Sequence, residues 1–258
     1  MNAILTFLGT GTSDGVPVIG CTCPVCLSDN PKNKRLRTSA WLHNDDVSIL
    51  IDCSSDFRQQ ALVHNIKSLD GILITHNHHD HIGGLDDMRP VNLNSGLIDL
   101  YISRMQSEGL KKSFYYIFEP VEQKGGGIPG IRLNEIFHTE CFAIKGILFE
   151  PLLVFHGVQE ILGFKTGNLA YLTDVKSLAD SSINKIRNTP ILVINALRYK
   201  AHHTHLNMEE ALALIERINP GKTYLIHTTH DMDYAEVSAK LPENVYLAYD
   251  GLDISVEI

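Results

Sequence analysis

The sequence lacks any long hydrophobic run, and no apolar stretch approaches the about 20 residues that a membrane span needs. It also lacks an excess of basic residues, since 22 Lys and Arg stand against 30 Asp and Glu, giving a formal net charge of −8. This balance argues against a general surface for nucleic acid or anionic membranes. The first residues lack the basic segment of a signal peptide and predict a strand instead. We therefore expect neither a membrane nor a nucleic-acid partner.

Cysteine is scarce as well. The chain has five cysteines, an odd number that does not suit a complete disulfide framework. Three of them crowd into the segment Cys21-Thr-Cys23-Pro-Val-Cys26. Such a cluster is more typical of metal-bound thiolates in a reducing compartment than of disulfides. The cytoplasm is therefore the expected location.

The chain is long enough to bury a full core. Its 258 residues, 44% of them hydrophobic, suffice for one domain, 1–258, built as a two-layered sandwich. Predicted strands and helices alternate in both halves of the chain, which indicates an α/β fold. One hairpin is expected from Ser39–His43 and Val47–Asp52, which are joined by a turn-type tripeptide.

Two predicted helices illustrate opposite kinds of boundary signal. Asn207 followed three residues later by Glu210 is typical of a capping box and predicts a helix over Met208–Ile218. A second helix-like stretch begins at Leu85, and we expect Pro90 to interrupt it.

The most informative stretch follows the short apolar run Ile72–Ile74, which predicts a buried strand. It contains four potential metal ligands within six residues, in the order His76-x-His78-x-Asp80-His81. Residues i and i+2 of an extended segment point the same way, so His76 and His78 can bind one ion together. Asp80 and His81 then face the other side of the same small space, where a second ion could bind. Imidazole and carboxylate ligands favour zinc, manganese or iron over calcium or magnesium.

Three further apolar runs end in a potential ligand: His156, Asp174 and His227. Since every candidate ligand stands at a strand end, we expect a site between two packed sheets.

The cysteine cluster predicts a second, separate metal site in a loop near residues 20–27. Its three thiolates need one more ligand to close a tetrahedral zinc site, and His230, three residues after His227, could supply it after a tight turn. Four protein ligands leave no open position, so this zinc would be structural.

The segment His76-x-His78-x-Asp80-His81, following a hydrophobic strand, resembles the signature of the metallo-β-lactamase superfamily of metallohydrolases. The resemblance implies an αββα sandwich with a dinuclear site. The implied ligands are His76, His78 and His156 for one ion, Asp80, His81 and His227 for the other, and Asp174 as the bridging carboxylate. It also implies that Asp52 accepts a hydrogen bond from a ligand histidine. Two ions about 3.5–4 Å apart can share a hydroxide that acts as the nucleophile.

The whole set of motifs, including the early Gly9-Thr-Gly11 and the cysteine cluster, resembles the phosphodiesterase family named for the accessory enzyme of the carbon–phosphorus lyase pathway. That enzyme hydrolyses 5-phosphoribosyl 1,2-cyclic phosphate. The resemblance implies a proton donor just before the helix start at Leu206-Asn207, which points to His203 and leaves His205 as the alternative. It also suggests a homodimer. Arg198 is a candidate phosphate contact by its charge alone.

The sequence thus predicts a dinuclear, metal-dependent phosphodiesterase that hydrolyses a small cyclic or sugar phosphodiester through a metal-bridging hydroxide. The expected cofactors are two catalytic divalent ions, zinc or manganese with iron as a further option, and one structural zinc. The alternatives are a tRNA 3′-processing endoribonuclease, an ester or lactone hydrolase on the same fold, and a non-catalytic metal-binding module. The acidic chain has no long basic insertion for RNA, which disfavours the first of these.

Overall fold

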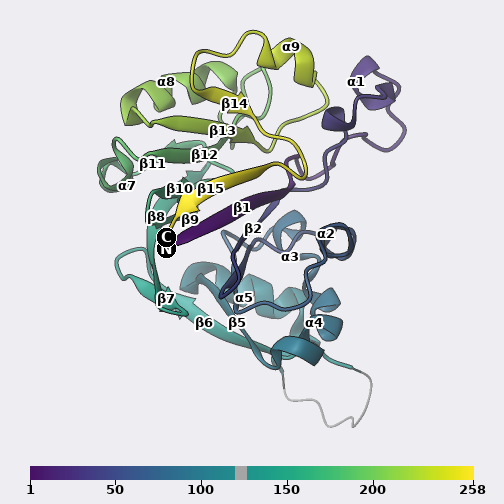
Figure 1. The fold of residues 1–258 in the computed structure, drawn as a ribbon, viewed down its shortest axis with the longest axis vertical. Coiled ribbons are helices and arrows are strands. Elements are labelled where there is room, and N and C mark those ends of the chain that lie inside the picture. Colours follow the sequence, from purple (N-terminus) through teal and green to yellow (C-terminus); the bar gives the residue numbers. More distant parts are fainter. Residues whose placement is uncertain (120–126) are drawn as a thin grey trace.

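Two β-sheets pack face to face with helices on both outer faces (Figure 1). The computed structural model describes residues 1–119 and 127–258. This architecture confirms the predicted αββα sandwich of the metallo-β-lactamase type.

The first sheet combines an antiparallel half with a parallel half. In spatial order its seven strands, among the described residues, are β15 (Asp253–Glu257), β1 (Asn2–Gly9), β2 (Ser39–His43), β3 (Ser48–Ile51), β4 (Gly71–Leu73), β5 (Ile98–Ser103) and β6 (Ile131–Ile136). Strands β15 to β3 pair antiparallel, and β3 to β6 pair parallel. The pairing of β2 with β3 confirms the predicted hairpin.

The second sheet has the same mixed character. Its strands, in spatial order, are β11 (Ser177–Leu178), β8 (Ile147–His156), β9 (Gln159–Thr166), β10 (Leu169–Tyr171), β12 (Ile191–Asn195), β13 (Lys222–Ile226) and β14 (Val245–Leu247), with β7 (Phe142–Ile144) pairing to β8. Strands β10, β12, β13 and β14 pair parallel. Strand β8 runs in the same direction, because it pairs antiparallel to β9, which pairs antiparallel to β10.

The helices divide between the two outer faces. The first sheet is covered by α2 (Phe57–His64), α3 (His79–Ile82), α4 (Met88–Ser95), α5 (Arg104–Ser113) and α6 (Tyr115–Phe118), and the second by α7 (Asp180–Ile186), α8 (Met208–Ile218) and α9 (Tyr234–Ser238). A short helix, α1 (Pro24–Leu27), lies in the cysteine loop. No helix in the described part of the chain is long and apolar enough to span a membrane.

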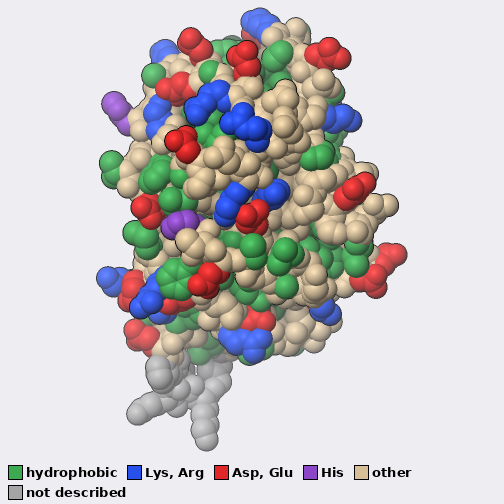
Figure 2. Space-filling view, turned by 90° about the vertical axis from the view of Figure 1, so that its left-hand side faces the viewer, with side chains coloured by type: hydrophobic (Ala, Val, Ile, Leu, Met, Phe, Trp, Pro, Cys, Tyr) green, Lys and Arg blue, Asp and Glu red, His purple; other side chains and the backbone are tan. Residues whose placement is uncertain are grey.

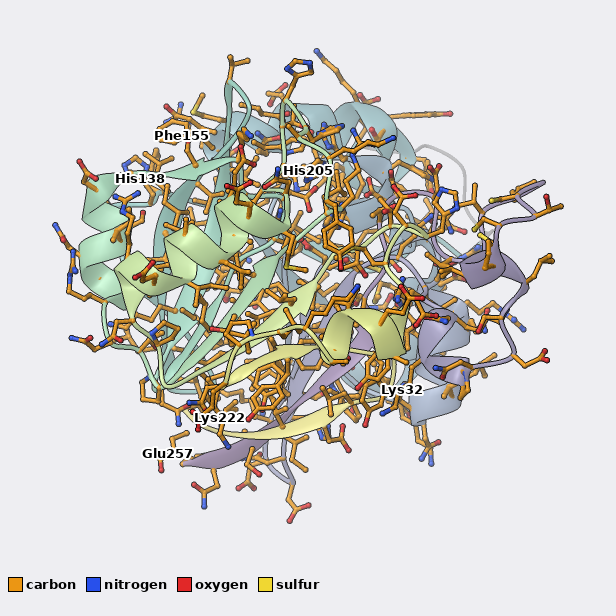
Figure 3. The ribbon with its side chains drawn as sticks, turned by 90° about the horizontal axis from the view of Figure 1, so that it is seen from above. Lys32, His138, Phe155, His205, Lys222 and Glu257 are labelled. Atoms are coloured by element: carbon orange, nitrogen blue, oxygen red, sulfur yellow. The ribbon has the colours of Figure 1, made fainter. Side chains whose placement is uncertain are left out.

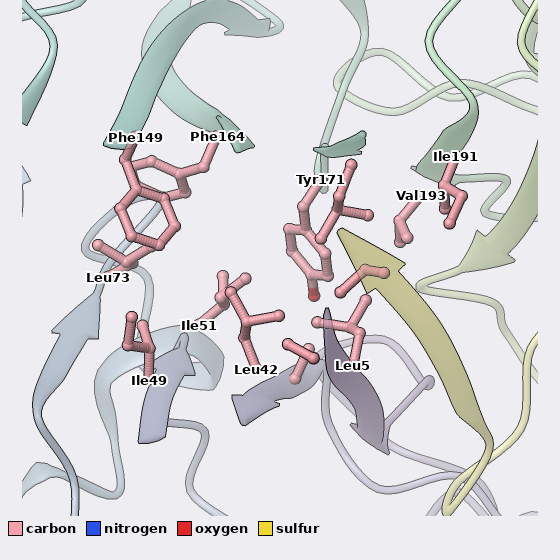
Figure 4. Packing of buried hydrophobic residues seen from close by; sticks show 14 of the residues in the cluster. Leu5, Leu42, Ile49, Ile51, Leu73, Phe149, Phe164, Tyr171, Ile191 and Val193 are labelled. Atoms are coloured by element: carbon pink, nitrogen blue, oxygen red, sulfur yellow. The ribbon is translucent and has the colours of Figure 1, made fainter. Parts of the chain in front are cut away.

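The central strands, such as β4, β10 and β12, are hydrophobic on both faces because the middle of each sheet is buried on both sides. In β3, Ile49 and Ile51 point into the core between the sheets, whereas Leu50 packs against the outer helices. Figure 4 shows side chains of the first sheet, such as Leu73, opposite Phe149 and others of the second. Each such fully buried side chain contributes about 1.5–3 kcal/mol to stability, so this layer holds the two sheets together.

Two helix predictions had different outcomes. Helix α8 begins after Asn207, and the predicted capping box with Glu210 is formed in both directions. The expected interruption at Pro90 is wrong, because α4 starts at Met88 and continues through Pro90 to Ser95. Pro90 falls in the first turn, where its missing N–H has no intrahelical partner to lose.

Candidate active site

The candidate ligands gather at one edge of the sandwich. His76 follows β4, His156 ends β8, Asp174 follows β10 and His227 follows β13, so strands of both sheets deliver them from their carboxyl ends. This is the edge at which parallel strands of α/β proteins present functional side chains. The sandwich thus brings together residues as far apart in sequence as His76 and His227.

The first group contains His76, His78, His156 and Asp174, whose potential ligand atoms all lie within 4.8 Å of one another. His76 Nε2 is 2.9 Å from His78 Nδ1 and 3.5 Å from Asp174 Oδ2. The rings of His78 and His156 are 5.1 Å apart between centroids. Three of the four side chains are buried, and His78 is exposed, so the group is open to solvent on one side.

The second group contains His81, Asp174 and His227. His81 Nε2 lies 3.4 Å from Asp174 Oδ2, and His227 Nδ1 lies 3.2 Å from Asp174 Oδ1. Asp80 lies beside this group, with its Oδ2 3.4 Å from His81 Nε2. Asp174 therefore belongs to both groups, which is the arrangement a bridging carboxylate requires.

Three residues of the site adopt left-handed backbone conformations: Asp52 and His227 directly after β3 and β13, and Asp174 three residues after the end of β10. The φ angles are 58° for Asp52, 56° for Asp174 and 54° for His227. This conformation is uncommon for residues other than glycine, although Asp and His adopt it more often than most, and it costs of order 1–3 kcal/mol where it is imposed. At Asp52 and His227 the resulting turn ends the strand.

Helix α3 is held against the end of β3 by close backbone contact. Gly84 N–H donates to Cys53 O at 3.0 Å, and Cys53 N–H donates to His81 O at 2.8 Å. A Cβ on Gly84 would lie 2.2 Å from Ser54 O, so no side chain fits there. Glycine at this position thus permits the close approach that places His81 beside Asp52.

Hydrogen bonds fix the imidazole orientations. His81 Nδ1–H donates to Asp52 Oδ2 at 2.8 Å, which is the contact the resemblance implied for Asp52. His156 Nδ1–H donates to the carbonyl oxygens of Asp174 at 3.0 Å and Thr204 at 2.9 Å. In both rings the proton on Nδ1 leaves Nε2 free to act as a ligand.

The electrostatics of the site couple its carboxylates to its imidazoles. Burial alone would raise the pKa of Asp174, but His227 and His81 outweigh it and hold the pKa well below its usual range. Burial lowers the pKa of His81, but Asp174 and Asp52 outweigh this and raise it. For His76, burial and the neighbouring His81 both act to lower the pKa. A buried centre with paired carboxylates and clustered imidazoles is typical of a metal site.

The surroundings of His81 Nε2 show whether a metal ion fits the second group. His81 Nε2 is buried, and no hydrogen-bond partner meets it among the described residues, although two carboxylate oxygens lie 3.4 Å away. In a tetrahedral site with bonds of about 2.0–2.1 Å, adjacent nitrogen and oxygen ligands stand about 3.4 Å apart. The separations of 3.4 and 3.5 Å from Asp174 Oδ2 to His81 Nε2 and His76 Nε2 therefore fit a shared divalent ion.

The segment before α8 separates the two candidate proton donors. His205 is buried, with its ring 4.6 Å from that of His156 and 5.0 Å from that of His227, between centroids. Figure 3 labels it on the segment that leads into α8. His203 is exposed.

Arg198, the predicted phosphate contact, makes its hydrogen bonds within its own loop. Its guanidinium donates to the carbonyl oxygens of Lys200 and Ala201.

The predicted cysteine cluster also comes together. His230 Nδ1 lies 3.2 Å from Cys21 Sγ, 3.4 Å from Cys23 Sγ and 3.5 Å from Cys26 Sγ. Tetrahedral zinc with these ligand types separates nitrogen and sulfur by about 3.6 Å. A hydrogen bond from the Cys26 N–H lowers the pKa of Cys23 to about 6, whereas burial raises the pKa of Cys26 to about 11. The cluster therefore fits one structural zinc.

Sequence reasoning missed several residues that hold the site. Thr38 Oγ1 lies 3.1 Å from His227 Nδ1 and donates to Gly11 O. Asn195 bonds both the N–H and the carbonyl of Val175, and so fixes the backbone next to Asp174. These contacts join distant segments and leave no local pattern, although the position of Asn195 at the end of a buried strand was a usable signal.

Comparison with a family model gives a match over residues 48–228, described as "Beta-lactamase superfamily domain". The matched range includes the six residues of the two histidine–aspartate groups and Asp80 beside them. Cys21, Cys23, Cys26 and His230 lie outside it.

Two curated proteins are similar over most of this chain. The "Octanoyltransferase" of Porphyromonas gingivalis (strain ATCC BAA-308 / W83) is 39% identical over 253 residues, which are 97% of this chain and 51% of that protein. The chain thus spans about half the length of this relative. The "Anti-Pycsar protein Apyc1" of Bacillus phage 010DV004 is 43% identical over 211 residues, 72% of this chain and 79% of that protein.

A solved structure described as "a New Diphosphatase from the PhnP Family" superposes with a TM-score of 0.92 at 40% sequence identity. The match covers 99% of this chain and 98% of that one. Both the fold and a large share of the sequence are therefore common to the two proteins.

Proposed function

The chain belongs to the beta-lactamase superfamily and is a hydrolase of the metallo-β-lactamase fold, and from this premise we propose that it is a dinuclear phosphodiesterase. Its substrate in this proposal is a small cyclic or sugar phosphodiester, or a diphosphate. The observation that carries the proposal is the sharing of Asp174 between the two candidate metal groups. A single carboxylate facing both groups is what two ions acting on one phosphoryl centre require.

In this proposal His76, His78 and His156 hold one ion, Asp80, His81 and His227 hold the other, and Asp174 bridges them. When bound, the ions supply Lewis acidity, lower the pKa of water and neutralise charge on the phosphoryl oxygens. The donor set suits zinc or manganese, and also accepts iron. The protein fixes the imidazoles with Nε2 free, as the hydrogen bonds of His81 and His156 support.

Hydrolysis adds water across the phosphorus–oxygen bond, and one proton must reach the leaving oxygen. We assign that donor to His205, because its ring lies among the ligand histidines and its buried Nδ1 meets no partner among the described residues. Burial, reinforced by His227, lowers the pKa of His205 to about 3. A bound phosphodiester would bring negative charge next to the ring and raise this pKa, so protonation would accompany substrate binding.

The His205→Ala variant is expected to lose about 10²–10⁴-fold in kcat for a substrate with an alkoxide leaving group, because that oxygen needs a proton. For a p-nitrophenolate leaving group, which departs without one, the loss should be much smaller. His203→Ala is the matched control, and we expect it to stay within about threefold of the wild type on both substrates. Equal losses in the two variants would contradict the assignment.

Three other functions compete with this one. A tRNA-processing nuclease needs a basic surface, but the chain has a formal net charge of −8. Figure 2, which views the left-hand side of Figure 1, shows acidic and basic side chains interspersed on that face. The relative named octanoyltransferase makes acyl esters worth testing, although it is about twice as long as this chain. Acyl transfer also calls for a nucleophile. Cys53 is fully buried, and Cys141 is not among the residues that gather at the site. Neither cysteine is therefore placed to act as that nucleophile.

The deciding experiment measures hydrolysis by metal-loaded protein of bis-p-nitrophenyl phosphate, ADP-ribose as a diphosphate diester, p-nitrophenyl phosphate, p-nitrophenyl octanoate and a γ-lactone. We expect turnover of the diester or the diphosphate, and a loss of at least about 10²-fold in the Asp80→Ala variant, because a ligand side chain is removed. Asp45→Ala changes an exposed turn residue and is the control.

Turnover of the octanoate or the lactone alone would move the protein to the ester-hydrolase branch. No turnover of any substrate by protein that holds its metals would favour the non-catalytic module.

We further propose that Cys21, Cys23, Cys26 and His230 hold one structural zinc. The proposal is supported by the thiolate-favouring pKa of Cys23 and by the near-tetrahedral spacing around His230. Metal-bound thiolates persist in reducing compartments, and this supports the cytoplasm as the place of the reaction.

A further inference from the structure

Asp52 is a buried carboxylate that bonds to more than one element of the site. It is fully buried at the end of β3. Its Oδ2 accepts from His81 Nδ1–H at 2.8 Å, and its Oδ1 accepts from the backbone N–H of Thr75 at 2.8 Å. The Thr75 hydroxyl also donates to this carboxylate, at 2.9 Å from Oδ2 and 3.1 Å from Oδ1. Among the described residues, every hydrogen bond to the Asp52 carboxylate thus comes from the segment that carries the candidate ligands.

The Thr75 hydroxyl makes one further contact, with His76 Nδ1 at 3.0 Å. A hydroxyl has a single proton to donate, and here that proton is committed to the carboxylate. The Thr75 oxygen must therefore accept from His76, which places the imidazole proton on Nδ1. Nε2 of His76 then carries the free lone pair, and this is the atom 2.9 Å from His78 Nδ1 and 3.5 Å from Asp174 Oδ2.

We propose that Thr75 is a positioning residue whose hydroxyl links the His76 ring to Asp52, so that one buried carboxylate orients a histidine in each of the two candidate metal groups. His81 is oriented directly, and His76 through Thr75. The inference rests on the proposed dinuclear site and deepens it.

The link has no substitute among the described residues. His76 is fully buried, and its Nδ1 has no other hydrogen-bond partner in that part of the chain. Valine has the shape of threonine without the hydroxyl, so Thr75→Val leaves the Nδ1–H unpaired and the ring free to turn. The direct bond between Asp52 and His81 is untouched by this change. Thr75→Val should therefore act on one metal group, whereas Asp52→Asn should act on both.

Metal affinity measures this difference without any substrate. Zinc is titrated into metal-free protein in competition with a chromophoric chelator. The cysteine site is the same in every variant, so differences between the variants report the two histidine–aspartate sites. We expect Thr75→Val to weaken one site about 10–100-fold and to leave the other within about threefold. Thr75→Ser, which restores the hydroxyl, should recover most of that loss. Asp52→Asn should weaken both sites at least about tenfold.

Equal weakening of both sites by Thr75→Val, no weakening at all, or failure of Thr75→Ser to recover affinity would each overturn the proposal. A measurement on the wild type covers the case in which Thr75→Val does not fold. Nitrogen-15 NMR of the zinc-loaded protein should show His76 protonated on Nδ1 and bound through Nε2, and the opposite tautomer would overturn the link. Wild-type protein that binds no zinc at these groups would overturn the dinuclear site itself, and the link with it.

Discussion

Replacing Asp174 by alanine is expected to lower kcat/KM at least about 10³-fold and to remove at least one of the two ions from the histidine–aspartate groups. The reason is that Asp174 is the side chain common to both groups, with Oδ2 3.4–3.5 Å from His76 and His81 and Oδ1 3.2 Å from His227. No other described carboxylate belongs to both groups, so none can take over the bridge. Steady-state kinetics and metal content per chain measure the two effects.

Two matched variants separate the causes of this loss. Asp174→Asn keeps the size of the side chain but removes its charge, so we expect it to be nearly as impaired as alanine. Asp45→Ala, in an exposed turn, should keep full activity and metal content. An Asp174→Ala protein that retains both ions and acts within tenfold of the wild type would show that Asp174 is not the bridge.

Part of this site could be predicted from the sequence, because the direction in which side chains point along a strand depends only on neighbouring residues. The run Ile72–Ile74 is apolar on both faces, and the spacing of His76 and His78 follows from the two-residue period of extended chain. The structure does bring these side chains together with His156 and Asp174. The placement of every candidate ligand at a strand end predicted a site between the two sheets, whereas the resemblance to the superfamily supplied the full set of ligands.

Other features could not be predicted, because tertiary contacts decide them. His203 and His205 have the same chemistry and lie two residues apart, and only the path of the loop buries one and exposes the other. The left-handed backbone of His227 could not be predicted from its residue type, because histidine favours this conformation only weakly. Thr38 reaches His227 across 189 positions of sequence. The effect of Pro90 on its helix could not be predicted either, because a proline interrupts a helix only when it lies beyond the first turn, and the start of α4 was not known from the sequence.

The His230→Ala variant is expected to lose one zinc per chain and to unfold about 5–10 °C below the wild type. The zinc would join the N-terminal cysteine loop to the segment that follows His227, so its loss releases a long-range cross-link. The loss should remain moderate, because Arg35 independently donates to the carbonyl oxygens of Thr229 and Met232 in that segment. Metal content and thermal unfolding measure the effect.

The same variant distinguishes a structural zinc from a catalytic one. His227 also contacts Thr38 and Asp174, and the adjacent Thr228 N–H donates to Thr10 O, so the active site should survive and kcat/KM should fall less than tenfold. Cys141→Ser alters an exposed cysteine outside the cluster and should leave both zinc content and unfolding temperature unchanged. Full metal content in His230→Ala would exclude this histidine as the fourth ligand. Complete loss of activity with a stable fold would instead mean that the cysteine cluster takes part in the chemistry, since only its metal would have been removed.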